Sequence, residues 1–358
     1  MINFSNFYKK KKILITGVTG FKGSWLATWL IMLGADVYGI GYQPNKNRKL
    51  FYDLKLNKKI KFSVIDVRNY NKLEKKINKI KPSIIFHLAA QPLIYESYQK
   101  PYSTFDINIR GTLNIMEIAR KYRFLKSIII VTSDKCYESN NSTKGFREDD
   151  RLGGIDPYSA SKASAELIVR AYRKSFFEKS KYFNVGISTA RAGNVIGGGD
   201  WSSNRLIPDI VRSIINKKKI IIRNPNFNRP WQHVLEPLKG YMLLAMKQYY
   251  LPKKFSSAWN FGTKPNSITS VKKIVEYLIK FWGAGSMLIR KNKLYEQVNL
   301  QLNIVKAQKK LKWSPSYNIK KSVEVTSEWY KKVVVLKHSA FKTTVNQIKK
   351  YMHDSRIN

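Results

Sequence analysis

A glycine-rich turn near the start of the chain constrains the fold more than any other segment. Gly17, Gly20 and Gly23 follow the apolar run Lys12–Thr16 directly and open a helix-like stretch. Glycines at this spacing permit a tight turn and let a pyrophosphate approach the backbone, while the free N–H groups of the helix start attract the anion. The pattern predicts a strand, a phosphate-binding turn and a helix, which together open a dinucleotide-binding fold.

The rest of the first half alternates apolar runs with helix-like segments, which favours βαβ units. We therefore expect an α/β fold of the Rossmann type, a doubly wound parallel sheet with helices on both faces. Parallel strands end at one edge of such a sheet, and ligands bind there. The expected strands are Lys12–Thr16, Asp36–Ile40, Lys61–Val67, Ser83–Leu88, Ser127–Thr132 and Asn184–Ala190, and the expected helices are Trp25–Leu33, Tyr70–Ile80, Asn108–Tyr122 and Tyr158–Phe177.

The composition of the chain changes after Arg191, where Gly, Pro and Trp residues cluster. We expect residues 1–190 to form the nucleotide-binding domain, with a segment near 230–262 returning to it through Ser257–Phe261. Helix-like pieces between loops predict a smaller α/β substrate-binding lobe over 191–337, and residues 338–358 read as a polar tail.

The charge of the chain is strongly positive, with 66 Lys and Arg against 23 Asp and Glu and a formal net charge of +43. Such an excess raises the question of nucleic-acid binding. The lysines are spread along the whole chain, however, and no zinc-finger, RNA-recognition or basic-helix pattern occurs. We do not expect a nucleic-acid partner, and a basic surface also suits small anionic substrates.

The cysteine count and the hydrophobic pattern indicate the cellular compartment in which we expect the protein. The single cysteine, Cys136, cannot form an internal disulfide, which points to a reducing, cytoplasmic setting. Four scattered histidines without a cysteine cluster give no metal site. The longest apolar run, near Trp25–Ala35, is too short to span a bilayer, and no signal peptide is recognisable.

Polar residues that could carry chemistry follow the strand Ser127–Thr132 as Ser133, Asp134 and Lys135. Further on, Asp156 and Pro157 suit the start of a helix, which would place Tyr158 and Lys162 one turn apart on one face. A neighbouring ammonium favours the phenolate and should lower the pKa of Tyr158 from about 10. Tyr158 is therefore a candidate base for a hydroxyl proton.

The identity of the dinucleotide is less constrained. Asp66 closes the third expected strand and could reach an adenine amino group or simply stabilise a turn. The acidic residue that usually meets the ribose 2′-hydroxyl is missing, because the stretch reads Gly41-Tyr42-Gln43-Pro44. These residues therefore do not indicate whether the bound dinucleotide is NAD or NADP.

Taken together, these motifs resemble the extended short-chain dehydrogenases that act on nucleotide sugars, and within them the 4,6-dehydratases of CDP-glucose. The resemblance covers about residues 7–335. The segments that carry it are Thr19–Leu26, His87–Pro92, Thr132–Tyr137, Arg191–Trp201 and Arg229–Pro237. The strings Phe-Lys-Gly-Ser-Trp at Phe21–Trp25 and Ser-Asp-Lys-Cys-Tyr at Ser133–Tyr137 are typical of that group.

The resemblance implies an NAD-dependent hydro-lyase of deoxysugar biosynthesis, as used for lipopolysaccharide O-antigen. Tyr158 would take the proton of the sugar 4-hydroxyl while the C4 hydride goes to NAD⁺, with Ser133 bonded to the 4-oxygen. Lys135 would remove the C5 proton, and Asp134 would protonate the departing 6-hydroxyl. Return of the hydride to C6 would give CDP-4-dehydro-6-deoxyglucose.

The resemblance also implies binding residues and assembly. Lys162 would hold the nicotinamide ribose, Asn194 and Arg229 would bind the substrate diphosphate, and a homodimer or homotetramer would form through Asn108–Tyr122 and Tyr158–Phe177. The full cofactor set is Gly17, Thr19, Gly20, Phe21, Lys22, Gly23, Asp66, Val67, Leu88, Ala89, Ala90, Tyr158 and Lys162, and the substrate set is Gln91, Asn194, Arg205 and Arg229.

Two segments, Glu138–Gly145 and Lys291–Asn303, depart from the pattern of the group. Two other functions therefore stay open. The first is a dehydratase or an epimerase of another nucleotide sugar, although the Asp134–Lys135 pair argues against a simple epimerase. The second is a non-catalytic NAD-binding protein that associates with nucleic acid.

Overall fold

The central sheet has the strand order of a doubly wound α/β fold. The structure, a computed structural model, describes residues 3–42, 50–138, 145–178, 184–264, 267–290 and 301–357. Seven parallel strands lie in the order β3-β2-β1-β4-β5-β6-β11, so the order reverses between β1 and β4. The predicted fold class is confirmed. The strands are β1 Lys12–Thr16, β2 Asp36–Gly41, β3 Lys61–Val64, β4 Ile84–His87, β5 Ser127–Val131, β6 Gly186–Ala192 and β11 Ala258–Phe261.

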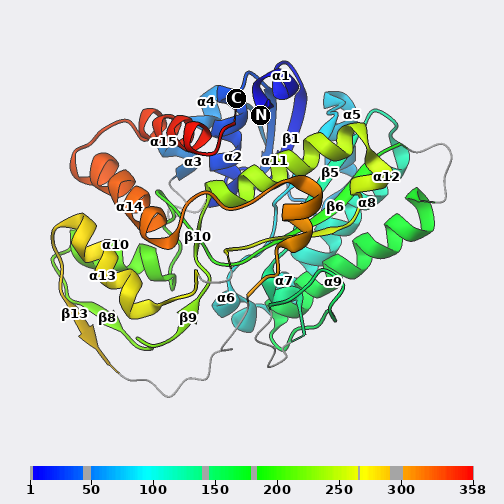
Figure 1. Ribbon diagram of the computed structural model, residues 1–358. Coiled ribbons are helices and arrows are strands. Elements are labelled where there is room, and N and C mark those ends of the chain that lie inside the picture. The colour runs from blue at the N-terminus through cyan, green and yellow to red at the C-terminus, as the bar shows by residue number, and fades with distance from the viewer. Residues whose placement is uncertain are drawn as a thin grey trace.

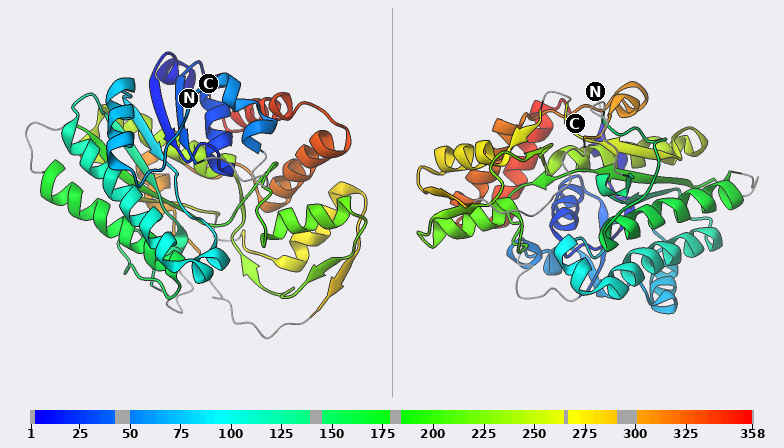
Figure 2. Two further views of the ribbon diagram at one scale, coloured as in Figure 1. Left: turned by 180° about the vertical axis from the view of Figure 1, so that it is seen from behind. Right: turned by 90° about the horizontal axis from the view of Figure 1, so that it is seen from below.

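Helices cover both faces of this sheet, which explains why its central strands β1, β4 and β5 are buried and largely apolar on both sides. In β1, Ile13 and Ile15 belong to the core under α2 (Phe21–Met32) and α11 (Leu235–Tyr250), whereas Leu14 faces the opposite core. That second core lies under α5 (Tyr70–Ile80), α8 (Gly111–Lys121) and α9 (Pro157–Tyr172), seen from behind in Figure 2.

The helix that carries the Tyr158 motif begins where its sequence predicts. The Asp156 carboxylate accepts a hydrogen bond from the Ser159 N–H at 3.0 Å, and Pro157 occupies the first turn. The predicted helix Tyr158–Phe177 is therefore real, but its last turn, Arg173–Phe177, is π-helical. A π-helical turn, Asp106–Arg110, likewise precedes α8.

The second half of the chain forms smaller α/β elements. Amphipathic helices α10 (Leu206–Ile215) and α13 (Val271–Trp282) cover two short parallel strands, β8 (Ile220–Ile222) and β13 (Met287–Ile289). Between α10 and α13 the chain returns to the main sheet, where β11 pairs with β6 and Ala258 lies opposite Thr189.

The remaining elements are short or peripheral. They are α1 Phe4–Tyr8, α3 Leu50–Asp53, α4 Leu56–Lys59, α6 Ile94–Gln99, α7 Pro101–Phe105, the 3-10 turn Asp134–Cys136, β7 Val195–Ile196, β9 Asn228–Arg229, β10 Gln232–His233, α12 Pro252–Phe255, β12 Thr269–Ser270, α14 Ile319–Tyr330, π-helical turns Ala307–Leu311 and Lys331–Val335, and α15 Ala340–Asp354. No helix in the described part of the chain is long and apolar enough to cross a membrane.

The C-terminal segment differs from the predicted polar tail. Helix α15 packs against α2, burying Ile348 and Tyr351, and the Tyr351 ring lies 5.8 Å from that of Trp29. The prediction is wrong because lysines on the exposed side mask a narrow apolar face. The two ends of the chain consequently lie close together, at the same side of the sheet (Figure 1).

Candidate active site

The glycine turn is built as its spacing predicts. Gly17 has a positive φ of 71°, and a Cβ there would lie 2.6 Å from the Ala89 nitrogen. A Cβ on Gly23 would lie 2.3 Å from the Gly17 carbonyl oxygen. Larger side chains are thus excluded at both positions, and the turn packs directly on the backbone of the loop after β4. The N-cap residue Gly20 has no side chain, so the first turn of α2 keeps backbone N–H groups for a ligand.

The loop after β4 lies beside this turn. The predicted cofactor residues Leu88, Ala89 and Ala90 follow His87, whose Nδ1 lies 2.7 Å from the Thr16 hydroxyl at the end of β1. Burial lowers the pKa of His87 to about 3, so this imidazole is neutral. Gly17 and Ala89 thus meet at the switch point of the sheet, where dinucleotides bind in such folds.

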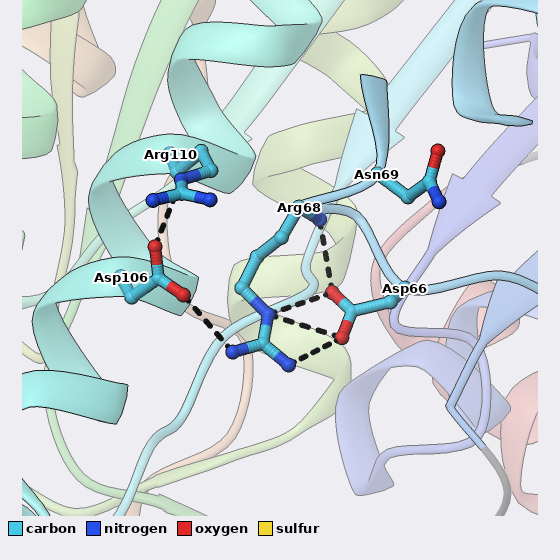
Figure 3. A pocket seen from close by; sticks show the side chains of 5 residues that line it. All are labelled: Asp66, Arg68, Asn69, Asp106 and Arg110. Carbon is cyan, nitrogen blue, oxygen red and sulfur yellow. Dashed lines mark hydrogen bonds and ion pairs between the residues drawn. The ribbon is translucent and has the colours of Figure 1, made fainter. Parts of the chain in front are cut away.

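Asp66 is engaged by a neighbouring arginine. Asp66 lies in the loop after β3. Figure 3 shows the Arg68 guanidinium between the carboxylate of Asp66 and that of Asp106. The Arg68 NH2 group lies 2.6 Å from Asp66 Oδ2, and NH1 lies 3.0 Å from Asp106 Oδ2. Hydrogen bonds from Arg68 lower the pKa of Asp66. An adenine amino group would have to share this carboxylate with Arg68. The neighbouring Val67 is buried, and its carbonyl accepts from Asn114.

The candidate chemical residues meet at the end of β5. Ser133 donates to Asp134 Oδ1 at 2.9 Å, and the Lys135 N–H donates to Ser133 at 3.2 Å. Tyr158 lies on the first turn of α9, where the Ser133 side chain acts to lower its pKa. Burial raises the pKa of Asp134, while Lys135 and Ser133 act against it. A carboxyl in this environment holds its proton more readily than an exposed one, as a general acid must.

The predicted lowering of the tyrosine pKa is wrong for the chain by itself. Burial raises the pKa of Tyr158 to about 12, and the Ser133 hydrogen bond offsets only part of this rise. The Lys162 ammonium is one turn away, but it donates to the Val131 carbonyl at 3.4 Å. Burial lowers the pKa of Lys162 itself to about 8. Desolvation therefore outweighs the favourable charge that the helix spacing suggests.

Lys22, predicted to bind cofactor, also extends toward the chemical residues. Its side chain on α2 interacts electrostatically with Asp134, Arg205 and Lys162. Burial, reinforced by Arg205, lowers the pKa of Lys22 to about 8. The Phe21 ring beside it approaches Gly197, where a Cβ would lie 3.0 Å from the ring. The glycine turn, β5 and the second lobe thus converge on one place.

The predicted substrate-binding residues lie in different surroundings. Arg205 lies 3.4 Å from Asp200, and its charge acts on Lys22 and Tyr158. The Asn194 carbonyl accepts from Gln232, which holds the segment after β6 to β10. Arg229 lies on β9, its guanidinium 5.5 Å from the Phe227 ring. The fourth residue, Gln91, is turned inward, since its amide donates to Leu93 and Thr104 at 3.0 and 2.9 Å. The structure favours a structural role for Gln91 instead of the predicted one.

Two charged residues near the site were not predicted as functional. Glu166 lies one turn beyond Lys162 on α9, and Arg191 is the charged residue of the buried strand β6; they pair at 2.8 Å with both side chains buried. The signal was present in the sequence, because opposite charges in two segments expected to be buried must find each other.

The two segments that depart from the group pattern have flanks that meet. Phe146 donates through its N–H to the Gln301 carbonyl at 2.7 Å, and its carbonyl accepts from Asn303 at 2.8 Å. Phe146 also stacks on Tyr137, which follows the Ser133–Cys136 turn. Residues 139–144 and 291–300 themselves lie outside the described residues.

Comparison with known proteins agrees with these features. A family model described as GDP-mannose 4,6 dehydratase matches residues 14–326. The chain is 42% identical to a CDP-glucose 4,6-dehydratase of Salmonella typhimurium over 330 residues, covering 91% of this chain and 92% of that protein. It is 26% identical to a UDP-glucuronate 4-epimerase of Thermodesulfobacterium geofontis, covering 90% of this chain and 97% of the relative.

Solved structures share the fold. A UDP-glucose 4-epimerase from Thermotoga maritima superposes with a TM-score of 0.78 at 21% identity, covering 90% of this chain and 99% of that one. A dTDP-glucose 4,6-dehydratase from Bacillus anthracis, in complex with NAD, gives a TM-score of 0.76 at 23% identity, covering 91% and 98%. The family model spans most of the chain and the Salmonella protein matches it almost end to end. The chain therefore belongs to the GDP-mannose 4,6-dehydratase family.

Proposed function

We propose that this protein is an NAD-dependent CDP-glucose 4,6-dehydratase, which converts CDP-D-glucose into CDP-4-dehydro-6-deoxy-D-glucose and water. The observation that carries the proposal is the meeting of Ser133, Asp134 and Lys135 at the end of β5 with Tyr158 and Lys162 of α9. An oxidation, a proton abstraction and an elimination need a base for oxygen, a base for carbon and an acid, and this set supplies one of each. The 42% identity to the Salmonella enzyme supports the choice of CDP-glucose.

The residues present fit NAD. The glycine turn leaves no room for a Cβ at Gly17 or Gly23, and the uncapped start of α2 points backbone N–H groups where a pyrophosphate would bind. NAD bound there would supply the acceptor and donor of the hydride that moves from C4 to C6 of the sugar, and its positive ring would favour a phenolate nearby. Lys162 would hold the nicotinamide ribose, and Thr19, Lys22 and Asp66 would complete the contacts.

The chain's own residues then divide the proton transfers. Tyr158 takes the proton of the 4-hydroxyl while the Ser133 hydroxyl bonds the 4-oxygen. Lys135 removes the proton at C5, which the 4-ketone acidifies. Asp134 gives its proton to the 6-hydroxyl, so that water leaves across C5–C6; its raised pKa favours the protonated form that this step requires. Atoms balance when Lys135 returns a proton to C5 as the hydride returns to C6, and the proton taken by Tyr158 makes up for the one that Asp134 gave to the departing water.

The second lobe would bind the nucleotide part of the substrate. Arg205 lies near Lys22 and Tyr158, and with Arg229 and Asn194 it would bind the diphosphate. The net charge of +43 favours the approach of such an anion in general terms.

We further propose a cytoplasmic homo-oligomer that assembles through α8 and α9. Leu167 of α9 and Phe176 of its π-helical end are 44% and 39% exposed, which is unusual for large apolar side chains on one helix. Burying them against a second copy would remove this surface from water. Whether two or four copies assemble is measured by light scattering of the purified protein.

The test is mass spectrometry of the purified protein incubated separately with CDP-, UDP-, dTDP- and GDP-glucose, with and without added NAD. We expect CDP-glucose alone to lose one water, and Tyr158→Phe to abolish the loss while NAD stays bound. Loss of water from another nucleotide sugar instead would contradict the choice of CDP. A product of unchanged mass but altered configuration would indicate an epimerase, and no reaction at all would contradict the proposal.

A further inference from the structure

The buried carboxylate of Glu166 connects three elements around the candidate site. One of its oxygens accepts a hydrogen bond from the Thr132 hydroxyl at 2.5 Å, and the other accepts from Thr189 at 2.7 Å and from Arg191 at 2.8 Å. Thr132 follows β5, Thr189 and Arg191 lie on β6, and Glu166 itself lies on α9. The carboxylate thus ties the helix that carries Tyr158 and Lys162 to the two strands beneath it.

Arg191 extends this connection to the far side of the chemical segment. Its NH1 group donates to the Tyr137 hydroxyl at 2.6 Å and to the Glu148 carbonyl at 3.0 Å. The Tyr137 hydroxyl in turn donates to Asn260 at 2.7 Å. The segment Ser133–Cys136 is therefore bracketed by Thr132 and Tyr137, and both brackets end on the same buried ion pair.

A pair of this kind is not explained by stability alone. Glu166 and Arg191 have side chains only 2% and 3% exposed, and desolvating both charges is costly. Apolar side chains of similar volume often stabilise such a position equally well. The ionisation of Glu166 is nevertheless secured, because Arg191 and the three hydrogen bonds outweigh burial and lower the pKa of the Glu166 carboxyl.

We propose that Glu166 is a positioning residue, which through Thr132 and the Arg191–Tyr137 contact holds the segment Ser133–Cys136 against α9. The bracing keeps the segment that carries Ser133, Asp134 and Lys135 at a constant distance from Tyr158 and Lys162. The role in turnover rests on the function proposed above, whereas the bracing of the segment does not depend on it.

Glu166 also supplies a charge that Lys162 needs. Its carboxylate opposes the effect of burial on the Lys162 ammonium, which is one helical turn away. Other titratable groups around Lys162 are Tyr158 on α9, Asp134, Lys135 and Cys136 on the 3-10 turn, Lys22 on α2, His87 on β4 and Arg191 on β6. Cys136 is a neutral thiol because burial raises its pKa well above the usual value, so Glu166 is the negative charge that acts on Lys162 at neutral pH.

Two threonines offer a matched test of the bracket. Thr132→Val and Thr189→Val each remove one hydroxyl that donates to the Glu166 carboxylate, but only Thr132 adjoins the chemical segment. Cys136, the single cysteine of the chain, is fully buried in that segment and reports its opening through the rate of reaction with a thiol reagent. We expect about tenfold faster labelling and about tenfold lower kcat in Thr132→Val, with KM for CDP-glucose little changed and smaller effects in Thr189→Val.

Glu166→Gln tests the charge. We expect the alkaline fall in kcat, and the alkaline fall in NAD affinity followed by tryptophan fluorescence, to move by about half a unit to one unit to lower pH. If this variant does not fold, as circular dichroism would reveal, Thr132→Val and Tyr137→Phe decide the bracing alone.

Equal labelling and equal kcat in the two threonine variants would overturn the bracing. An alkaline fall at the wild-type pH in Glu166→Gln would overturn the charge role. If the wild-type protein turns over no nucleotide sugar, the proposed function fails, while the labelling rates and the pH dependence of NAD affinity still test the positioning of Ser133–Cys136 and Lys162.

Discussion

Burial sets the protonation state of the individual side chains in the site. It raises the pKa of Tyr158 to about 12 and lowers that of Lys162 to about 8, so at neutral pH the free chain holds a phenol beside an ammonium. It also raises the pKa of Asp134, which suits an acid. In the proposed mechanism the tyrosine therefore needs positive charge from bound ligands before it can act as a base in this dry region.

Removal of the Lys135 amine should stop carbon deprotonation. We expect Lys135→Ala to lower the rate of water loss from CDP-glucose by about a hundredfold or more, the usual range for a missing general base. Solvent deuterium should no longer enter at C5, as mass spectrometry of the sugar in heavy water would record. Lys126→Ala, before the opposite end of β5, is the matched control. Unchanged deuterium entry in Lys135→Ala would remove Lys135 from this role.

At this scale the sequence predicted which residues meet but not how they are buried. The spacing of Tyr158 and Lys162 on a helix and the place of Ser133 after a strand are local facts, and the structure brings all three together. The direction of the Tyr158 pKa and the inward turn of Gln91 depend on elements distant in the sequence. For example, the Gln91 N–H donates at 2.8 Å to the side chain of Asn108, which lies in the separate π-helical turn Asp106–Arg110.

Several helices end on lysines in a backbone conformation that usually belongs to glycine. Lys81, after α5, has a φ of 51°, and Lys312, after the π-helical turn Ala307–Leu311, has a φ of 57°. The Lys81 N–H still donates to the Ile77 carbonyl at 2.9 Å, so the capping bond is made despite the strained residue. The lysine surplus of the chain therefore extends to positions that select against a side chain.

Replacing one of these lysines should stabilise the protein. We expect Lys81→Gly to raise the free energy of unfolding by about 0.5–1 kcal/mol, since glycine adopts the left-handed conformation without steric cost. Urea unfolding would measure the change. Lys79→Gly, inside the last turn of α5, is the control and should destabilise by about 1 kcal/mol. A lower urea midpoint for Lys81→Gly would mean that its side chain makes a compensating contact.

Across the whole molecule, Glu236 joins parts of the chain that are far apart in sequence. This buried carboxylate on α11 accepts hydrogen bonds from the Tyr317 N–H at 2.7 Å and from the Tyr351 hydroxyl of α15 at 2.6 Å. Burial raises the pKa of the Glu236 carboxyl, and the hydrogen bond from the Tyr351 hydroxyl acts to lower it again. The sequence did not reveal this hub, because α15 reads as polar and its partner lies more than a hundred residues earlier.

Loss of the Tyr351 hydroxyl should therefore weaken the whole fold. We expect Tyr351→Phe to lower the free energy of unfolding by about 1–3 kcal/mol at pH 7, because Glu236 loses a donor while it stays buried. A raised folded-state pKa means that ionised Glu236 opposes folding, and protonation relieves this cost as the pH falls. The deficit of Tyr351→Phe should accordingly shrink at pH 5. Tyr102→Phe, 79% exposed, is the control, and a pH-independent deficit would contradict the explanation.

The late return of β11 to the sheet has a consequence for protein synthesis. Its partner β6 is buried along its whole length, yet the strand that covers its edge follows in the chain only after α10, β8 and α11. A nascent chain on the ribosome therefore carries an unpaired apolar strand edge until Ala258–Phe261 has emerged, and such edges recruit other chains. The edge stays uncovered until α10, β8 and α11 have been made, so these elements leave the ribosome before the sheet is complete.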